Sequence, residues 1–179
     1  TVFDMASVSK SISTAICALI LTERGQLRLT DPVNLYLPAF SEEIRITDLL
    51  THTSGLPAYA PVNKLAEQYG SPNPEGLIEY IAGCKPVFKP GSDFQYSCLN
   101  YIVLQHIIET ISGQSLRNFA KANIFDPLGM SHTDYCPTGE ILEHCAPTEK
   151  QKDGSVLKGV VHDPLARIMN GGISGNAGV

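Results

Sequence analysis

Apolar residues recur every three or four positions along several stretches of this chain, a spacing typical of helices that bury one face. Residues 7–22 form the first such stretch, in which the helical period is set by Ile12, Ala15, Ile16, Leu19 and Ile20. Residues 99–111 carry a second strong pattern, which ends near Gly113. A third helix is predicted from Ser115 to about residue 124, where Asp126-Pro127 stops it.

Shorter elements are predicted between and after these helices. One short helix begins at about Thr47, and two more cover residues 63–70 and 74–82, where Pro74 suits a first helical turn. Turn-forming residues dominate after residue 130, and Asp153-Gly154 lies between β-branched residues, a pattern that predicts a hairpin. We therefore expect a mainly helical segment with few strands of its own.

The first helix is apolar enough to be largely buried, so it needs a packing partner on its second face. The predicted elements offer little sheet for that purpose. We expect sheet strands that precede Thr1 and follow Val179, or that come from another chain, to complete the domain.

Composition and charge exclude some classes of partner. The chain is 43% hydrophobic, as ordinary globular proteins are, and has no apolar run near the length of a membrane span. Its net charge is −5 and it has no basic cluster, which argues against nucleic acid as a partner.

Five cysteines are spread along the chain without any CxxC pair. Cys136, His144 and Cys145 match no standard metal-site spacing, so no metal is expected. An odd number of cysteines leaves at least one thiol unpaired unless it pairs with another chain, and the redox compartment stays open.

Candidate chemistry begins with Ser7 and Lys10, because residues three apart are neighbours on a helix. A buried lysine within hydrogen-bond reach can take the proton of a serine hydroxyl as that hydroxyl attacks a carbonyl. Ser7 is thus the candidate nucleophile and Lys10 its base. The spacing alone is weak, since a surface serine and lysine also cap ordinary helices.

A second serine and lysine three residues apart allow a comparison within the same chain. Ser155 and Lys158 are also three apart, but they lie in the predicted hairpin, where such residues point to opposite faces. Only the pair at Ser7 lies in the first turn of an apolar helix, where free N–H groups and the helix dipole favour a developing oxyanion.

Several ordered motifs resemble one known family. They are LLTHTSGLP from Leu49, KPGSDFQYSCLNYIVLQHIIETISG from Lys89, IFDPLGMSHT from Ile124 and VHDPLARIMNGGISGNAGV from Val161. Their order and spacing resemble the serine β-lactamase and penicillin-binding protein-like family, above all its branch of class C β-lactamases, D-alanyl-D-alanine carboxypeptidases and family VIII esterases. The resemblance covers nearly the whole chain.

This resemblance implies a fold, a domain and a set of catalytic residues. The fold would be α+β and β-lactamase/transpeptidase-like, with the chain as its mainly helical part. Residues 1–179 would form a partial serine hydrolase domain, with the nucleophile helix at 7–22, a helical region at 47–135, and a hairpin and glycine-rich segment at 136–179. Ser7 would be acylated, Lys10 would be the family's lysine, and Tyr96 would relay protons to the leaving group.

Cys98 departs from the family pattern. It stands two residues after Tyr96, where the family usually has an asparagine that binds the substrate's amide and steadies the lysine. A thiol cannot replace the hydrogen bonds of a carboxamide. Strong β-lactamase activity is therefore more doubtful than ester hydrolysis. Asn100 is interpreted as structural, and Cys98 as a residue of the substrate site, with a nucleophilic Cys98 as a minor alternative.

The family's third motif, a Lys-Thr-Gly or His-x-Gly strand, is absent from these residues. One oxyanion donor would come from the Ser7 backbone and the other from that strand, so this chain alone should be catalytically incomplete. His52 is interpreted as a turn anchor. The adjacent pair His162-Asp163 is interpreted as a loop anchor, because neighbouring residues rarely face each other.

Two main hypotheses follow. The first is a serine hydrolase that forms an acyl-enzyme on Ser7, uses no metal or organic cofactor, and acts on a D-amino-acid peptide, a β-lactam or a small ester. The second is a penicillin-binding or peptidoglycan-sensing module that does not hydrolyse, or a pseudoenzyme. A purely helical interaction domain is a third. The resemblance implies a bacterial protein of the cell envelope, periplasmic or extracellular, and the residues themselves leave a cytoplasmic location open.

Overall fold

A computed structural model describes residues 1–179 and shows a mainly helical molecule. The helices are Ala6–Val8 (η1), Lys10–Ala15 (η2), Ile16–Glu23 (α1), Val33–Leu35 (η3), Ile46–Leu50 (α2), Val62–Tyr69 (α3), Pro74–Ala82 (α4), Cys98–Ser112 (α5), Leu116–Ala120 (α6), Lys121–Phe125 (η4), Gly139–Glu143 (α7) and Leu165–Met169 (η5). The only sheet has two strands, Pro147–Lys150 (β1) and Val156–Lys158 (β2).

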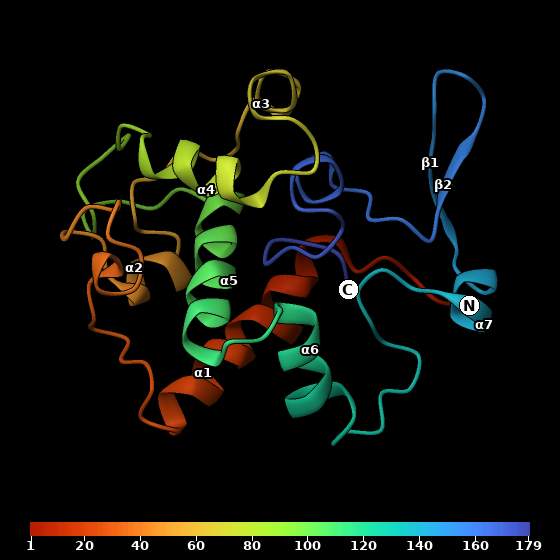
Figure 1. Cartoon of the computed structure of the whole chain (residues 1–179), viewed down its shortest axis with the longest axis horizontal. Helices are drawn as coiled ribbons and strands as arrows, with labels where there is room; N and C mark the ends of the chain where they lie inside the picture. The colour runs from red at the N-terminus through yellow and green to blue at the C-terminus, as the bar shows by residue number, and fades with distance from the viewer.

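Helix α5 lies at the centre of the molecule and packs against α1, α2, α4 and α6 (Figure 1). It is apolar on nearly all sides, which is why it is buried along most of its length. Ser97 caps its beginning by accepting a hydrogen bond from the Leu99 N–H, and Gly113 ends it in the left-handed conformation. The helix predicted over 99–111 is therefore present, with slightly wider bounds.

The helix predicted over 7–22 is present as three consecutive segments of different pitch. A 3₁₀ turn, η1, is followed by a π-helical stretch, η2, and then by the α-helix α1. Ser7 lies in the 3₁₀ turn, directly after Ala6, whose φ of 46° is in the left-handed region that a residue with a side chain rarely occupies. The nucleophile candidate thus follows a strained backbone position.

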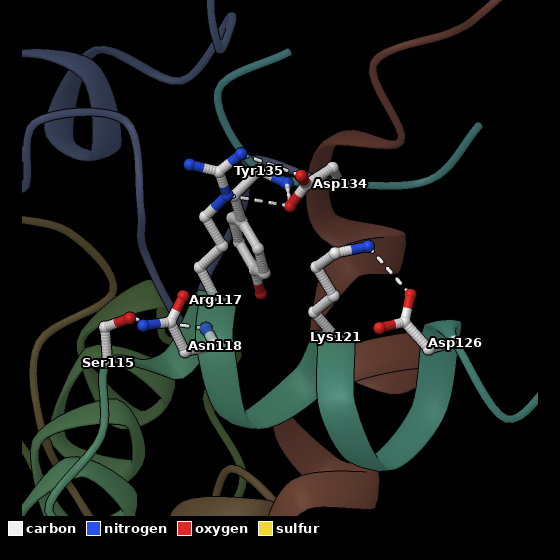
Figure 2. Close-up of polar contacts among 7 residues, drawn as sticks. All are labelled: Ser115, Arg117, Asn118, Lys121, Asp126, Asp134 and Tyr135. Atoms are coloured by element: carbon white, nitrogen blue, oxygen red, sulfur yellow. Dashed lines mark hydrogen bonds and ion pairs between the residues drawn. The ribbon is translucent and has the colours of Figure 1, made fainter. Parts of the chain in front are cut away.

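The remaining predicted helices are also present. Helices α3 and α4 match the patterns at 63–70 and 74–82, and α6 with η4 matches the one that begins at Ser115. Ser115 caps α6 by accepting a hydrogen bond from the Asn118 N–H (Figure 2). Short helices η3, α7 and η5 were not predicted, because segments of three to five residues carry too little periodicity to detect.

The predicted hairpin is present as strands β1 and β2, which pair antiparallel with Pro147 opposite Lys158. It extends away from the helical body beside α7 (Figure 1). The side chains of β1 are all exposed. No helix of the structure combines the length and the apolar character that crossing a membrane requires.

Tyr135 ties the segment after η4 to the nucleophile helix. Its ring is fully buried and its hydroxyl donates a hydrogen bond of 2.9 Å to the Ser13 Oγ atom. The neighbouring Asp134 accepts two hydrogen bonds from the Arg117 guanidinium, at 2.9 and 2.8 Å (Figure 2). Helix α6 and the loop at Asp134 are therefore fastened to each other and, through Tyr135, to η2.

We expect Tyr135→Phe to lower the free energy of unfolding by about 1–3 kcal/mol, because it leaves the buried Ser13 hydroxyl without this partner. The double variant Tyr135→Phe/Ser13→Ala removes both hydroxyls. Its loss of unfolding free energy should be smaller than the sum of the losses in Tyr135→Phe and Ser13→Ala. Urea unfolding of the wild type, the two single variants and the double variant measures this coupling. Additive losses would show that the hydrogen bond contributes nothing.

The Arg117–Asp134 pair should make stability depend on pH. Burial is the largest single influence on Asp134 and opposes its ionisation. The hydrogen bonds from Arg117 and from the Tyr135 N–H, together with the positive charge of Arg117, outweigh it, so the pKa of Asp134 lies below its ordinary value of 3.8. The stabilisation by the Arg117–Asp134 pair is present at pH values above the ordinary pKa of an aspartate. It disappears as the pH falls through the lower pKa that Asp134 has in the folded state. The free energy of unfolding of the wild type should exceed that of Asp134→Asn by about 1 kcal/mol at pH 7, and the two values should converge in stronger acid. Urea unfolding at different pH values measures both. A gap that is constant with pH would contradict this.

Candidate active site

Ser7 and Lys10 lie side by side where η1 meets η2. The Lys10 Nζ atom is 3.0 Å from the Ser7 Oγ atom. Ser7 is exposed, whereas Lys10 is only 3% exposed. The spacing recognised in the sequence therefore brings together an accessible hydroxyl and a buried amine within hydrogen-bond reach.

Lys10 has two further polar contacts from distant parts of the chain. Its Nζ atom donates to the backbone carbonyl of Asn176 at 2.9 Å and to the Cys98 Sγ atom at 3.7 Å. It also lies 5.0 Å from the ring centroid of Tyr96 and 5.8 Å from that of Tyr101, within cation–π range. The lysine is thus surrounded by groups that fix its direction.

Tyr96 contributes its ring, rather than its hydroxyl, to this arrangement. The residue is 45% exposed, and its ring lies 4.5 Å from that of His52, centroid to centroid. Its hydroxyl forms no hydrogen bond with Ser7 or Lys10, whose side-chain partners are the atoms named above. The structure therefore brings Tyr96 next to Lys10 and leaves the phenol oxygen unengaged.

His52 holds the loop that carries Tyr96. Its backbone carbonyl accepts a hydrogen bond from the Gln95 N–H at 3.0 Å, and its Nδ1 atom accepts one from the Ser97 N–H at 3.2 Å. Burial, and secondarily the positive charge of Lys10, lower the pKa of His52, which favours the neutral ring that can accept this bond. The predicted role as a turn anchor is confirmed.

Asn100 supports the same loop from α5. It is fully buried, its Oδ1 atom accepts a hydrogen bond of 2.6 Å from the Ser54 hydroxyl, and its Nδ2 atom lies 3.2 Å from the Nδ1 atom of His52. Asn100 is not among the hydrogen-bond partners of the Lys10 amine. The interpretation of Asn100 as structural is confirmed.

Cys98, the first residue of α5, lies beside Lys10 with only 9% of its surface exposed. Burial raises the pKa of its thiol, and this effect exceeds the opposite influence of the Lys10 charge. A thiol that stays protonated is a poor nucleophile. The minor alternative of a nucleophilic Cys98 is therefore not supported.

Asn176 is the residue that sequence reasoning missed. It is fully buried, and its backbone carbonyl is a partner of Lys10 across 166 positions of sequence. Its side chain donates from Nδ2 to an oxygen of Asp163 at 3.1 Å and accepts a hydrogen bond from Ser174 at 2.6 Å. A backbone carbonyl carries no sequence signal, so no pattern could have identified this contact.

His162 and Asp163 do not form a dyad. The His162 ring lies 3.3 Å from Glu149, on the hairpin side. Asp163 accepts hydrogen bonds from the Tyr59 hydroxyl at 3.0 Å and from the Ala166 N–H at 2.8 Å. The prediction of a loop anchor is confirmed, and Asp163 in addition touches the segment that contacts Lys10.

A cavity of about 230 Å³ is lined by the first five residues, by parts of α7 and by Gly178 and Val179, and it includes none of Ser7, Lys10 and Tyr96. No group of three or more histidine, cysteine, aspartate or glutamate side chains is placed to hold a metal ion. An exposed hydroxyl within hydrogen-bond reach of a buried amine is the kind of arrangement that proton transfer and nucleophilic attack by serine require.

The sequence of this chain is similar to those of known proteins along its whole length. The sequence profile of the family described as Beta-lactamase matches residues 1–178. The chain is 31% identical over 205 aligned residues to an N-acetylmuramyl-L-alanine amidase of Bacillus subtilis (strain 168), an alignment that covers 100% of this chain and 46% of the relative. The chain spans about half the length of the curated relatives that it matches.

Solved structures agree with the sequence comparison. A class C beta lactamase from Rhodobacter sphaeroides superposes with a TM-score of 0.72 at 27% identity, over 87% of this chain and 43% of that one. A beta-lactamase/D-alanine carboxypeptidase from Yersinia pestis superposes with a TM-score of 0.67 at 26% identity, over 79% of this chain and 42% of that one. The chain thus has the predicted β-lactamase/transpeptidase fold, mostly in its helical part, and it belongs to the β-lactamase family of serine hydrolases.

Proposed function

We propose that this protein is a serine hydrolase in which Ser7 forms the acyl-enzyme and Lys10 is its base. The observation that carries the proposal is the 3.0 Å contact between Lys10 Nζ and Ser7 Oγ, made by an exposed hydroxyl and a buried amine. Nucleophilic catalysis by serine needs a base at this distance.

The surroundings of Lys10 suit both protonation states of its amine. A neutral amine has two N–H donors, for Asn176 O and Cys98 Sγ, and one lone pair, which accepts the proton of Ser7. As Ser7 Oγ bonds to the acyl carbon, its proton moves to Lys10 Nζ. The ammonium then has three N–H donors for the same three atoms, so the transfer requires no rearrangement of the site.

Tyr96 is proposed to deliver a proton to the leaving group. Its hydroxyl is unengaged and its side chain is half exposed, so an incoming substrate can reach it. The Tyr96 ring also lies within cation–π distance of the amine that receives the proton of Ser7. Breakdown of the tetrahedral intermediate releases the leaving group with the proton from Tyr96, and the Tyr96 phenolate then takes the proton that Lys10 received from Ser7. A water molecule attacks the acyl-enzyme, which frees the acid and restores the Ser7 hydroxyl.

The oxyanion of the intermediate needs two donors, and the Ser7 backbone N–H is proposed as one. The second would come from a Lys-Thr-Gly or His-x-Gly strand, which these 179 residues lack. Since the curated relatives are about twice as long, we infer that the chain is part of a larger hydrolase domain that supplies this strand.

The proposed substrates are small acyl donors: a D-amino-acid peptide, a β-lactam or an ester. The names of the relatives, an amidase and a beta-lactamase/D-alanine carboxypeptidase, support the first two. Cys98 favours the ester, because a thiol in contact with Lys10 offers no carboxamide to bind a substrate amide. Such substrates and relatives fit a protein of the bacterial cell envelope.

Cys98 also favours a second candidate function, a penicillin-binding module that is acylated and does not turn over. A carboxamide at this position would help to orient the bound acyl group, and sulfur is a weak hydrogen-bond partner. The two candidate functions differ in the rate of deacylation.

We expect incubation of the longer protein with a fluorophosphonate, or separately with a penicillin, to add the mass of one adduct. The Ser7→Ala variant should show none, because it lacks the attacking oxygen. Lys10→Ala should slow labelling by about a hundredfold or more, since it removes the base. Intact-protein mass spectrometry measures each.

Decay of the penicillin adduct would identify a hydrolase, and its persistence a penicillin-binding module. A folded protein that forms no adduct with either reagent would refute the proposed function.

We expect Cys98→Asn to shift the preference of the site from esters towards amides. The variant supplies a carboxamide beside Lys10, so penicillin acylation should accelerate relative to hydrolysis of a p-nitrophenyl ester by about tenfold. Cys98→Ser, which restores no carboxamide, is the matched control. An unchanged ratio of the two rates in Cys98→Asn would show that position 98 does not read the substrate.

A further inference from the structure

The turn that contacts Lys10 is fixed from three directions. The Ala177 N–H donates to the Ser174 carbonyl at 3.3 Å, which closes a turn over residues 174–177. The Gly175 carbonyl accepts a hydrogen bond of 2.8 Å from Thr14 of η2, and its N–H donates to Gln105 of α5 at 2.9 Å. These bonds place the turn between the nucleophile helix and α5.

Asp163 makes the third connection, through the side chain of Asn176. The carboxamide of Asn176 is fully buried, and its Nδ2 atom donates to Asp163 Oδ1 at 3.1 Å. The same residue's carbonyl accepts the bond from Lys10 at 2.9 Å. One residue therefore links the acidic group to the lysine.

The carboxylate of Asp163 is itself held in place. Besides Asn176, it accepts hydrogen bonds from the Tyr59 hydroxyl at 3.0 Å and from the Ala166 N–H at 2.8 Å. Burial, followed by the negative charge of Asp163, raises the pKa of Tyr59, so its phenol stays protonated and donates. The Tyr59 hydroxyl in turn accepts from the Leu165 N–H at 2.9 Å. A carboxylate with these partners is a rigid support rather than a mobile surface charge.

We propose that Asp163 is a positioning residue for Lys10, which it aligns with Ser7 by fixing the side chain of Asn176. The inference rests on the proposed function, because it assigns a role in preparing the same base. Loss of the Asp163–Asn176 bond would leave a buried amide donor without a partner and would let the turn move. The Asn176 carbonyl would move with it, and Lys10 would lose part of its alignment.

The competing explanation is that Asp163 only caps helix η5, through its bond with the Ala166 N–H. Substitutions can separate the two roles. Asp163→Ser keeps a capping oxygen but is too short to reach Asn176 as well. Asp163→Asn keeps an oxygen of the right length for both partners.

The test compares these variants by two measurements on the longer protein. The first is the side-chain NMR signal of Lys10 in protein labelled with ¹³C,¹⁵N-lysine, assigned with Lys10→Arg. The second is the rate at which Ser7 is labelled by a fluorophosphonate. Circular dichroism confirms that each variant is folded, and Tyr59→Phe serves as a control that removes a different partner of the same carboxylate.

We expect Asp163→Ser to shift the Lys10 signal and to slow Ser7 labelling by about tenfold, because a small misplacement of a catalytic group has a large effect on rate. Asp163→Asn should recover most of both values, and Tyr59→Phe should change them least. Asn176→Ala breaks the same contact from the other side and should shift the Lys10 signal as Asp163→Ser does.

A Lys10 signal that is unchanged in folded Asp163→Ser and Asn176→Ala would overturn the positioning role and leave capping as the explanation. Failure of the proposed function has a different result, since wild type would then show no Ser7 labelling at all. The Lys10 signal would still decide whether Asp163 positions the amine.

Discussion

The site depends on one constraint: the buried amine of Lys10 must find polar partners inside a largely apolar interior. A buried polar group without partners is costly, so the chain has to bring acceptors to it. It does so with Ser7 from the same helix, Cys98 from the start of α5 and the Asn176 carbonyl. These segments are far apart in sequence, and the geometry of the site is therefore a property of the whole fold.

A close approach of backbone to backbone makes this convergence possible. Gly175 lies against α5 so tightly that a Cβ atom there would overlap the carbonyl oxygen of Tyr101. Glycine is required at this position because of space, not because of its φ angle. The approach lets Gln105 bind the Gly175 N–H and brings the following carbonyl, that of Asn176, to Lys10. Within the glycine-rich sequence from Gly171, Gly175 thus has a packing reason, whereas Gly171 and Gly172 have positive φ angles of 62° and 90°.

Sequence reasoning succeeded where the signal is local. The apolar periods predicted α5, α4 and the first helical region, and Asp153-Gly154 predicted the hairpin. The three-residue spacing predicted the contact of Ser7 with Lys10. Local patterns did not reveal the π-helical stretch η2, because π-helices are rare and the apolar period of residues 7–22 matches an ordinary α-helix. They also missed the partners supplied by backbone atoms of remote segments.

For the same reason, the motif that contains Tyr96 predicted its position beside Lys10 but not the orientation of its ring. A motif fixes the position of the residue beside the lysine, but the orientation of its ring depends on the His52 ring, with which it packs at 4.5 Å. That packing turns the ring face, rather than the hydroxyl, towards the amine. A polarised face stabilises a cation without accepting its proton, whereas a hydroxyl can exchange one. The loop held by His52 therefore determines which of these two interactions Lys10 experiences before a substrate arrives.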